Sequence, residues 1–226
     1  MKKPVVALLA SALAIAIVAS GGLAITASAQ DSSSDATIYV GSLYEPQNLD
    51  NTAGGGQGVT EAFDGNVYEG LFRLTDSGDV EPLLAADHTV SDDGLVYTFT
   101  LQPGVTFHSG KPLTSEDVKF SIEKVFAPES QSARKSSFGA IASIEAPAPD
   151  TVVVTLAEPS ISFIYNLSYV WVYNKDATDF TTSEDGTGPY VLDGWTRRTP
   201  SRPPPCSWAW SSGATSSRTC SACTRV

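Results

Sequence analysis

Two histidines, His88 and His108, are the side chains in this sequence best suited to acid–base or metal chemistry near neutral pH. A metal site or a catalytic dyad is often marked by a second histidine three or four residues away, and neither residue has one. We therefore expect each to be an ordinary histidine at a strand edge or in a loop. The sequence predicts no catalytic residue and no set of metal ligands.

Other patterns that could support chemistry are incomplete. The glycine-rich run Gly54–Gly58 lacks the Lys-Ser/Thr pair of a phosphate-binding loop, so we interpret it as a flexible link. Cys220 and Cys223 have the spacing of half a zinc or redox site, but the second half is missing. No serine nucleophile elbow or other hydrolase signature is present. We predict neither an enzyme nor a bound cofactor.

The central part of the chain is strongly acidic. Residues 30–196 carry seven Lys and Arg against 25 Asp and Glu, a net charge of −18. Nucleic acids and anionic lipids require cationic side chains to neutralise phosphate, so neither is expected as a partner. The carboxylates instead indicate a solvated surface. These 167 residues contain no cysteine, which excludes a disulfide scaffold, and they suffice for one or two small folding units.

The first 29 residues have the pattern of an export signal. Met1–Lys3 supplies positive charge, Pro4–Leu23 an apolar run, and Ala27–Ala29 a small-residue cleavage site. The alternative is a transmembrane anchor, which needs about 20 apolar residues, but serine and glycine interrupt this run. No cysteine lies near the cleavage point, so a lipid-modified N-terminus is not expected. We predict an exported mature protein that begins at Gln30.

Composition changes abruptly after Thr196. Residues 197–226 contain all three cysteines, five arginines and seven serines, but no Asp, Glu, Leu, Ile, Phe or Tyr. A stretch without large aliphatic side chains cannot bury enough apolar surface to offset its ordering entropy, so we predict a disordered tail. Our preferred explanation is a shifted reading frame in GC-rich DNA. A genuine low-complexity extension rich in Arg, Pro and Ser is the alternative.

Between these ends, hydrophobic patterns predict strands that alternate with short helices. Thr114–Asp117 is a capping box followed by apolar residues at helical spacing, which predicts an amphipathic helix. A second helix is predicted over Thr60–Tyr68, and a short one after Pro159. Two hairpins are predicted, one from residues 87–91 and 96–101 and one from residues 141–145 and 151–156. Further strands are predicted over residues 37–42, 169–173 and 190–195.

Several motifs together resemble those of a known family. They are Asn66–Leu71 (NVYEGL), Glu81–Ala85 (EPLLA), Tyr97–Ser121 (YTFTLQPGVTFHSGKPLTSEDVKFS) and Gly186–Tyr190 (GTGPY). In this order they resemble family 5 of the extracellular solute-binding proteins, the oligopeptide, dipeptide and nickel type, over about residues 36–195. Members of that family serve ATP-binding-cassette importers. They capture peptides, nickel chelates or other small solutes outside the membrane and pass them to a permease.

The resemblance implies an α/β fold that corresponds to the N-terminal part of a type II periplasmic binding protein. Residues 36–51 and 169–196 would be parts of lobe I, residues 52–168 an α/β subdomain inserted into it, and the second lobe would be missing. Such proteins enclose a solute between two lobes that close around it. We therefore expect this chain to be truncated and unable to bind ligand alone.

The resemblance also implies which residues face the ligand. In the family, the loop after the first strand lines the cleft. The candidate ligand-binding residues in that loop are Tyr44, Glu45, Pro46, Gln47 and Asn48. Ser137 and Phe138 are further candidates, because the corresponding segment approaches ligand in some relatives. Turn formation and core packing are the competing roles for these residues.

The implied function is that of the substrate-binding component of an ABC importer. Its expected partners are a small solute (an oligopeptide, a dipeptide or a nickel chelate) and the permease and ATPase subunits of the importer. It would act at the periplasmic or extracellular face of the cell membrane. The alternative is an exported interaction domain, or a periplasmic enzyme on a related scaffold, and either would require the tail to be authentic.

Overall fold

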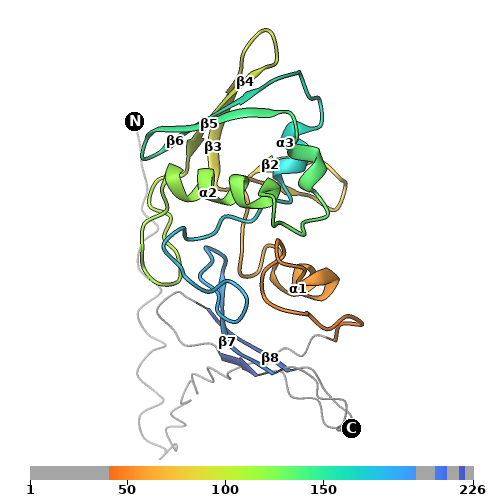
Figure 1. Ribbon diagram of the computed structural model, residues 1–226. Coiled ribbons are helices and arrows are strands. Elements are labelled where there is room, and N and C mark those ends of the chain that lie inside the picture. Colours follow the sequence, from red (N-terminus) through yellow and green to blue (C-terminus); the bar gives the residue numbers. More distant parts are fainter. Residues whose placement is uncertain (1–40, 197–206, 213–218, 222–226) are drawn as a thin grey trace, which may run out of the picture. The chain divides into compact units, whose positions relative to one another are not determined.

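The computed structural model describes residues 41–196, 207–212 and 219–221 (Figure 1). The predicted export signal and residues 37–40 of the first predicted strand lie outside these ranges. The described residues form a four-stranded, a three-stranded and a two-stranded sheet. No helix within them is both long enough and apolar enough to cross a membrane.

The four-stranded sheet is antiparallel throughout. Its strands, in spatial order, are β3 (Ala85–Val90), β4 (Val96–Leu101), β6 (Thr151–Leu156) and β5 (Ile141–Ala148). Along β6, Val152, Val154 and Leu156 are buried while the residues between them are half-buried, so one face of the sheet carries the apolar side chains. The hairpins β3–β4 and β5–β6 confirm both hairpin predictions.

Helix α2 (Ser115–Phe126) lies across one face of this sheet (Figure 1). It begins at the predicted capping box, where the Asp117 carboxylate accepts hydrogen bonds from the Thr114 N–H at 3.1 Å and the Thr114 hydroxyl at 2.6 Å. The helix residues that enter the core are Val118, Ile122 and Val125. The predicted amphipathic helix is confirmed, including its starting residue.

Four short elements complete this first core. They are the hairpin of β1 (Phe72–Leu74) and β2 (Val80–Pro82), the 3-10 helix η1 (Lys135–Phe138) and helix α3 (Phe163–Leu167). The β1–β2 hairpin was not predicted, because each strand has only three residues. Its turn contains Gly78 at φ 88°, a left-handed conformation that favours glycine.

A second core lies between helix α1 (Gly56–Phe63) and the segment that follows α3. Its buried members are Leu49, Val59, Phe63, Val67, Tyr68, Trp171 and Tyr173. The rings of Tyr68 and Trp171 stack with centroids 5.1 Å apart. The predicted domain boundary at residue 52 falls inside this second core, whereas the first core contains residues from Leu71 to Val172.

Helix α1 differs from the helix predicted over Thr60–Tyr68. It begins four residues earlier, at Gly56, so part of the glycine-rich run is helical rather than a flexible link. It ends at Phe63 because Asp64 is extended and Gly65 has φ 67°. The chain then doubles back, so that the Tyr68 N–H donates to the Phe63 carbonyl at 3.1 Å. This reversal brings the Tyr68 ring into the second core.

The prediction of a strand over residues 169–173 is wrong, although the segment is largely buried. Its backbone N–H groups find separate partners instead of one neighbouring strand. Val170 donates to Leu167 O at 3.1 Å, and Val172 donates to Glu69 O at 2.9 Å. The Tyr173 N–H donates to the hydroxyl of Ser121 at 2.8 Å. Periodicity could not reveal this, because an apolar run has the same appearance in a buried strand and in a buried irregular segment.

The three-stranded sheet contains β7 (Tyr190–Thr196), β8 (Ser207–Ser212) and β9 (Thr219–Ser221) in that order. Strand β7 confirms the predicted strand that follows the GTGPY motif. Within residues 197–226, which we predicted to be disordered, β8 pairs with β7 and β9 pairs with β8. Such pairing uses backbone groups and does not need aliphatic side chains. The rest of the tail lies outside the described residues.

Candidate functional site

The loop predicted to face the ligand exposes two large apolar side chains. Leu43 is 95% exposed and Tyr44 is 54% exposed. The base of the loop is ordered by hydrogen bonds. The Ser42 hydroxyl donates to Glu61 Oε2 at 2.7 Å, and the Tyr44 N–H donates to the Ser42 hydroxyl at 3.2 Å. The loop therefore presents apolar groups to solvent from a defined backbone.

Helix α1 holds the loop from beneath at Gly58. A Cβ atom at this position would lie 2.5 Å from the Tyr44 carbonyl oxygen and 2.7 Å from the Pro46 nitrogen, so only glycine allows this approach. Pro46 is buried and Glu45 is half-buried. The exposed Gln47 donates its backbone N–H to Gly55 O at 2.9 Å. Through these contacts the loop packs directly against α1 and the residue before it.

Asn48 begins the turn that leads out of the loop. Its side chain donates to Ala53 O at 2.9 Å and accepts from the Asp50 N–H at 2.8 Å. The Leu49 N–H donates to Thr181 O at 2.9 Å. Asn48 is half-buried, and both its hydrogen bonds are structural ones. The side chains with most surface for a ligand are therefore those before it.

A buried ion pair fixes the end of the loop to helix α2. The Asp50 side chain is 5% exposed and pairs with Lys124, whose side chain is 16% exposed. Lys124 also donates to the Thr52 hydroxyl and lies 4.9 Å from the ring centroids of Tyr173 and Phe180. The Asp50 carboxylate accepts further hydrogen bonds, from the Thr52 N–H at 2.8 Å among others. The Asp50–Lys124 ion pair thus joins the loop to helix α2, and both charged groups also have hydrogen-bond partners in Thr52.

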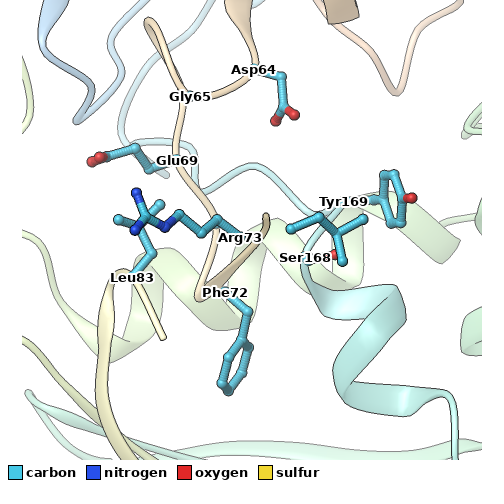
Figure 2. Close-up of a pocket in the computed structure, with 10 residues that line it drawn as sticks. Asp64, Gly65, Glu69, Phe72, Arg73, Leu83, Ser168 and Tyr169 are labelled. Atoms are coloured by element: carbon cyan, nitrogen blue, oxygen red, sulfur yellow. The ribbon is translucent and has the colours of Figure 1, made fainter. Parts of the chain in front are cut away.

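The structure contains a cavity of about 250 Å³ that the sequence did not reveal, and Figure 2 shows residues that line it. Arg73 and Glu69 lie on one side of it in this view, and Asp64 and Tyr169 on the other. Apolar groups from Phe72, Leu74 and Leu83 form much of the remaining lining. The cavity begins where α1 ends, since Asp64 is the residue that follows the helix.

Both carboxyl groups of this cavity are partly shielded from water by the protein. Although Asp64 as a residue is exposed, burial of its carboxyl group raises its pKa, and the hydrogen bond from Trp171 Nε1 at 2.8 Å offsets this in part. Burial also raises the pKa of Glu69, against the opposing hydrogen bond from the Thr187 hydroxyl at 2.9 Å. Arg73, across the cavity, pairs with Glu81 at 2.8 Å. The cavity therefore favours a polar or cationic guest over an anionic one.

The other two candidates, Ser137 and Phe138, lie in η1. Ser137 is half-buried. Phe138 is 1% exposed, and its ring meets that of Phe163 edge to face at 6.3 Å. The structure thus places Phe138 inside the first core. The guanidinium carbon of Arg134, the residue before η1, lies 3.7 Å from the ring centroid of Tyr169, which is one of the residues that line the cavity.

The two histidines have different environments. His88, on β3, packs against the rings of Phe72 and Phe99, as expected for a strand histidine. His108 lies in a loop, but it is not isolated from carboxylates, since its Nδ1 is 2.8 Å from Glu184 Oε2. These two residues are 76 positions apart, so local spacing could not predict the contact. Among the described residues, no group of three or more His, Cys, Asp or Glu side chains could hold a metal ion.

Comparison with known proteins gives a consistent result. Residues 79–199 match the family model described as "Bacterial extracellular solute-binding proteins, family 5 Middle". The glutathione-binding protein GsiB of Salmonella typhimurium is 33% identical over 171 residues, which cover 71% of this chain and 32% of that protein. GsiB of Escherichia coli is 31% identical over 185 residues, with 76% and 34% covered. The chain spans about a third of the length of these relatives.

Solved structures of similar fold include NikZ from Campylobacter jejuni in complex with Ni(L-His). Its TM-score is 0.66 and its identity 26%, and the match covers 78% of this chain and 35% of NikZ. The oligopeptide-binding protein AppA from Bacillus subtilis, in complex with a nonapeptide, has a TM-score of 0.69 and 20% identity over 83% of this chain and 40% of AppA. These matches confirm the predicted α/β fold class, that of type II periplasmic binding proteins, of which the chain covers a part.

Proposed function

Because the chain belongs to the bacterial extracellular solute-binding proteins of family 5, we propose that it supplies one face of the solute-binding cleft of an ABC importer component. Such a component would be exported by the segment over residues 1–29 and would act outside the membrane. It would deliver its solute to permease and ATPase subunits. The protein would bind rather than transform its solute, as its relatives are solute-binding proteins.

The main observation behind this proposal is the pair of exposed apolar side chains on a firmly packed loop. Burial of large exposed apolar groups by a ligand is favourable, and a loop whose backbone is already ordered loses little further backbone entropy when the ligand binds. Leu43 and Tyr44 are both exposed, and the backbone at Tyr44 is held by Gly58 and by the hydrogen bond to Ser42. Glu45 and Gln47 lie beside them and supply polar groups that can orient a bound solute. Phe138 is not part of this face, because it is buried.

The class of solute that we propose is a peptide or a similar small molecule. The relatives named above bind glutathione, an oligopeptide or a nickel–histidine complex, according to their names. Glutathione and oligopeptides carry an ammonium group and amide bonds. The carboxyl groups of Asp64 and Glu69, which line the cavity, suit the ammonium group, and the polar residues of the loop suit the amide bonds. A nickel chelate would enter as cargo and not as a resident cofactor.

The two cores support a modified division of the chain. Residues 49–68 and 171–195 contribute to the second core, and we propose that they form the lobe I portion. The inserted subdomain would then begin near Gly70 and include the four-stranded sheet with α2. On this division α1 and β7 belong to lobe I, and we assign the ligand loop to it as well, because the loop packs against α1 at Gly58. A single lobe cannot enclose a solute, so the chain by itself would bind weakly or not at all.

The proposal can be tested in a chimera. Residues 41–196 would replace the matching segment of Escherichia coli GsiB, so that a second lobe is present, and glutathione binding would be measured by isothermal titration calorimetry. We expect saturable binding by the chimera and none by the 226-residue chain. Tyr44→Ala should weaken binding about tenfold or more, because truncating an aromatic anchor typically costs more than about 1.4 kcal/mol.

Ile161 provides a matched control, since it is an apolar residue with a fully exposed side chain on a different part of the chain. Leu43→Ala should weaken binding, while Ile161→Ala should leave it unchanged. If the Tyr44→Ala and Leu43→Ala chimeras fold and both bind glutathione as tightly as the unsubstituted chimera, the proposed ligand face is wrong. Tight saturable binding by the unmodified chain would contradict the requirement for a second lobe.

A further inference from the structure

His108 is enclosed between two oxygen atoms that accept hydrogen bonds. Its Nδ1 lies 2.8 Å from Glu184 Oε2, and its Nε2 lies 2.8 Å from the Gly188 carbonyl oxygen. The side chains of His108 and Glu184 are only 9% and 4% exposed. Water therefore has little access to either ring nitrogen, and the protein itself must satisfy both.

This geometry determines where protons must be. A carbonyl oxygen can only accept, so Nε2 must carry a hydrogen. At Nδ1, either the imidazole donates to an ionised carboxylate, or a protonated Glu184 donates to the ring nitrogen. Each arrangement holds one more proton than neutral His108 beside ionised Glu184. Without that proton the ring has one N–H for two acceptors, so the lone pair of either Nδ1 or Nε2 would face an oxygen lone pair in a buried site.

The surrounding charges favour retention of this proton. Asp185 follows Glu184 directly, and Glu69 lies nearby, bound to the Thr187 hydroxyl. The nearest cation on the same loop, Lys111, pairs with Asp117 and Asp176 at 2.7 Å each. Burial alone would lower the pKa of His108, but the hydrogen bonds to Glu184 and Gly188 and the charges of Glu184 and Asp185 raise it above its ordinary value.

The pair joins segments that belong to different cores. His108 follows Phe107, which is buried in the first core, and its backbone N–H donates to Gly186 O at 2.9 Å. The other carboxylate oxygen of Glu184 accepts from the Leu192 N–H on β7 at 3.0 Å, and Leu192 packs against the second core. One carboxylate thus holds the histidine loop and the strand together.

We propose that His108 and Glu184 form a proton-dependent latch that fastens the segment before β7 to the loop between β4 and α2. With the shared proton present, the latch is closed and the two cores are held together. Loss of the proton leaves at least one of the two ring contacts unfavourable and loosens this junction. The latch does not depend on solute binding, so it can be tested independently of the proposed function.

The pH dependence follows from proton linkage. Unfolded histidine has a pKa of about 6.5, and that of folded His108 is higher. The stabilisation is therefore complete below about pH 6.5 and is lost as the pH rises through the folded-state value. Within that window each pH unit should increase the unfolding equilibrium constant up to about tenfold, because unfolding then releases one proton. His108→Gln should remove this dependence.

The other histidine provides the control. Urea unfolding of the full chain would be measured from pH 6 to 9 for the wild type, His108→Gln and His88→Gln. We expect the free energy of unfolding to fall with rising pH more steeply in the wild type and in His88→Gln than in His108→Gln, which lacks the titrating pair. Equal pH slopes in all three proteins would overturn the latch.

A direct measurement covers the case in which His108→Gln does not fold. The ring nitrogens of the wild type would be observed by NMR, with His88→Gln used to assign the two histidines. We expect His108 Nε2 to carry a hydrogen throughout, and the His108–Glu184 pair to lose one proton above about pH 6.5. A pair that already lacks the shared proton at pH 6 would refute the proposal.

Discussion

Removing the charge of Lys124 should destabilise the protein much more than removing the charge of a surface lysine. Lys124→Met keeps the aliphatic stem that packs near Tyr173 and Phe180, but it leaves the buried Asp50 carboxylate without its cation. Breaking a buried pair in this way typically costs about 3–5 kcal/mol. Asp50 retains hydrogen bonds from Thr52, so we expect the lower end, about 3 kcal/mol.

That loss should be visible in both chemical and thermal unfolding. For a chain of this size, 3 kcal/mol corresponds to a fall in melting temperature of about 6–12 °C. Lys175→Met is the matched control, because Lys175 pairs with Asp176 on the surface and should matter much less. Adding Asp50→Asn to Lys124→Met should restore part of the stability, since no unpaired charge then remains buried. Equal urea midpoints for Lys124→Met and Lys175→Met would refute this reasoning.

Two further predictions concern the fold. A Cβ atom at Gly186 would overlap the backbone carbonyl of Val67, so Gly186→Ala should lower the urea midpoint strongly or prevent folding. Gly194→Ala should be tolerated, because no atom lies within 4 Å of its Cβ position. Similar midpoints for the two alanine variants would contradict the packing described for the GTGPY motif. Thr114→Ala should cost about 1 kcal/mol by removing the hydroxyl that donates to Asp117, as measured by urea unfolding. No change in that variant would show that the capping box adds nothing to stability.

Local sequence signals predicted the elements whose stability is local. The capping box at Thr114 gave the starting residue of α2, and two hairpins followed from alternating apolar residues around short turns. The predicted start of helix α1 was four residues too late. The true start depends on the packing of Gly58 against residues 44–46, which helix propensity does not reveal. Propensity is a weak guide where tertiary contacts decide the boundaries.

The missed features all depend on long-range contacts. Glu184 lies 76 positions from His108, and the segment over 169–173 distributes its N–H groups among partners from three parts of the chain. The cavity beside Asp64 likewise combines residues near position 70 with Ser168 and Tyr169. The resemblance to the family indicated the ligand loop, but its exposed apolar pair and buried ion pair became evident only in the structure.

The most direct test of the account is a crystal structure of the chimera with its solute bound. We predict that the solute lies within about 4 Å of one or more side chains in the loop over residues 43–48, the distance of direct contact. A solute held in the cleft without any contact to that loop would contradict the central claim that these residues form the ligand face.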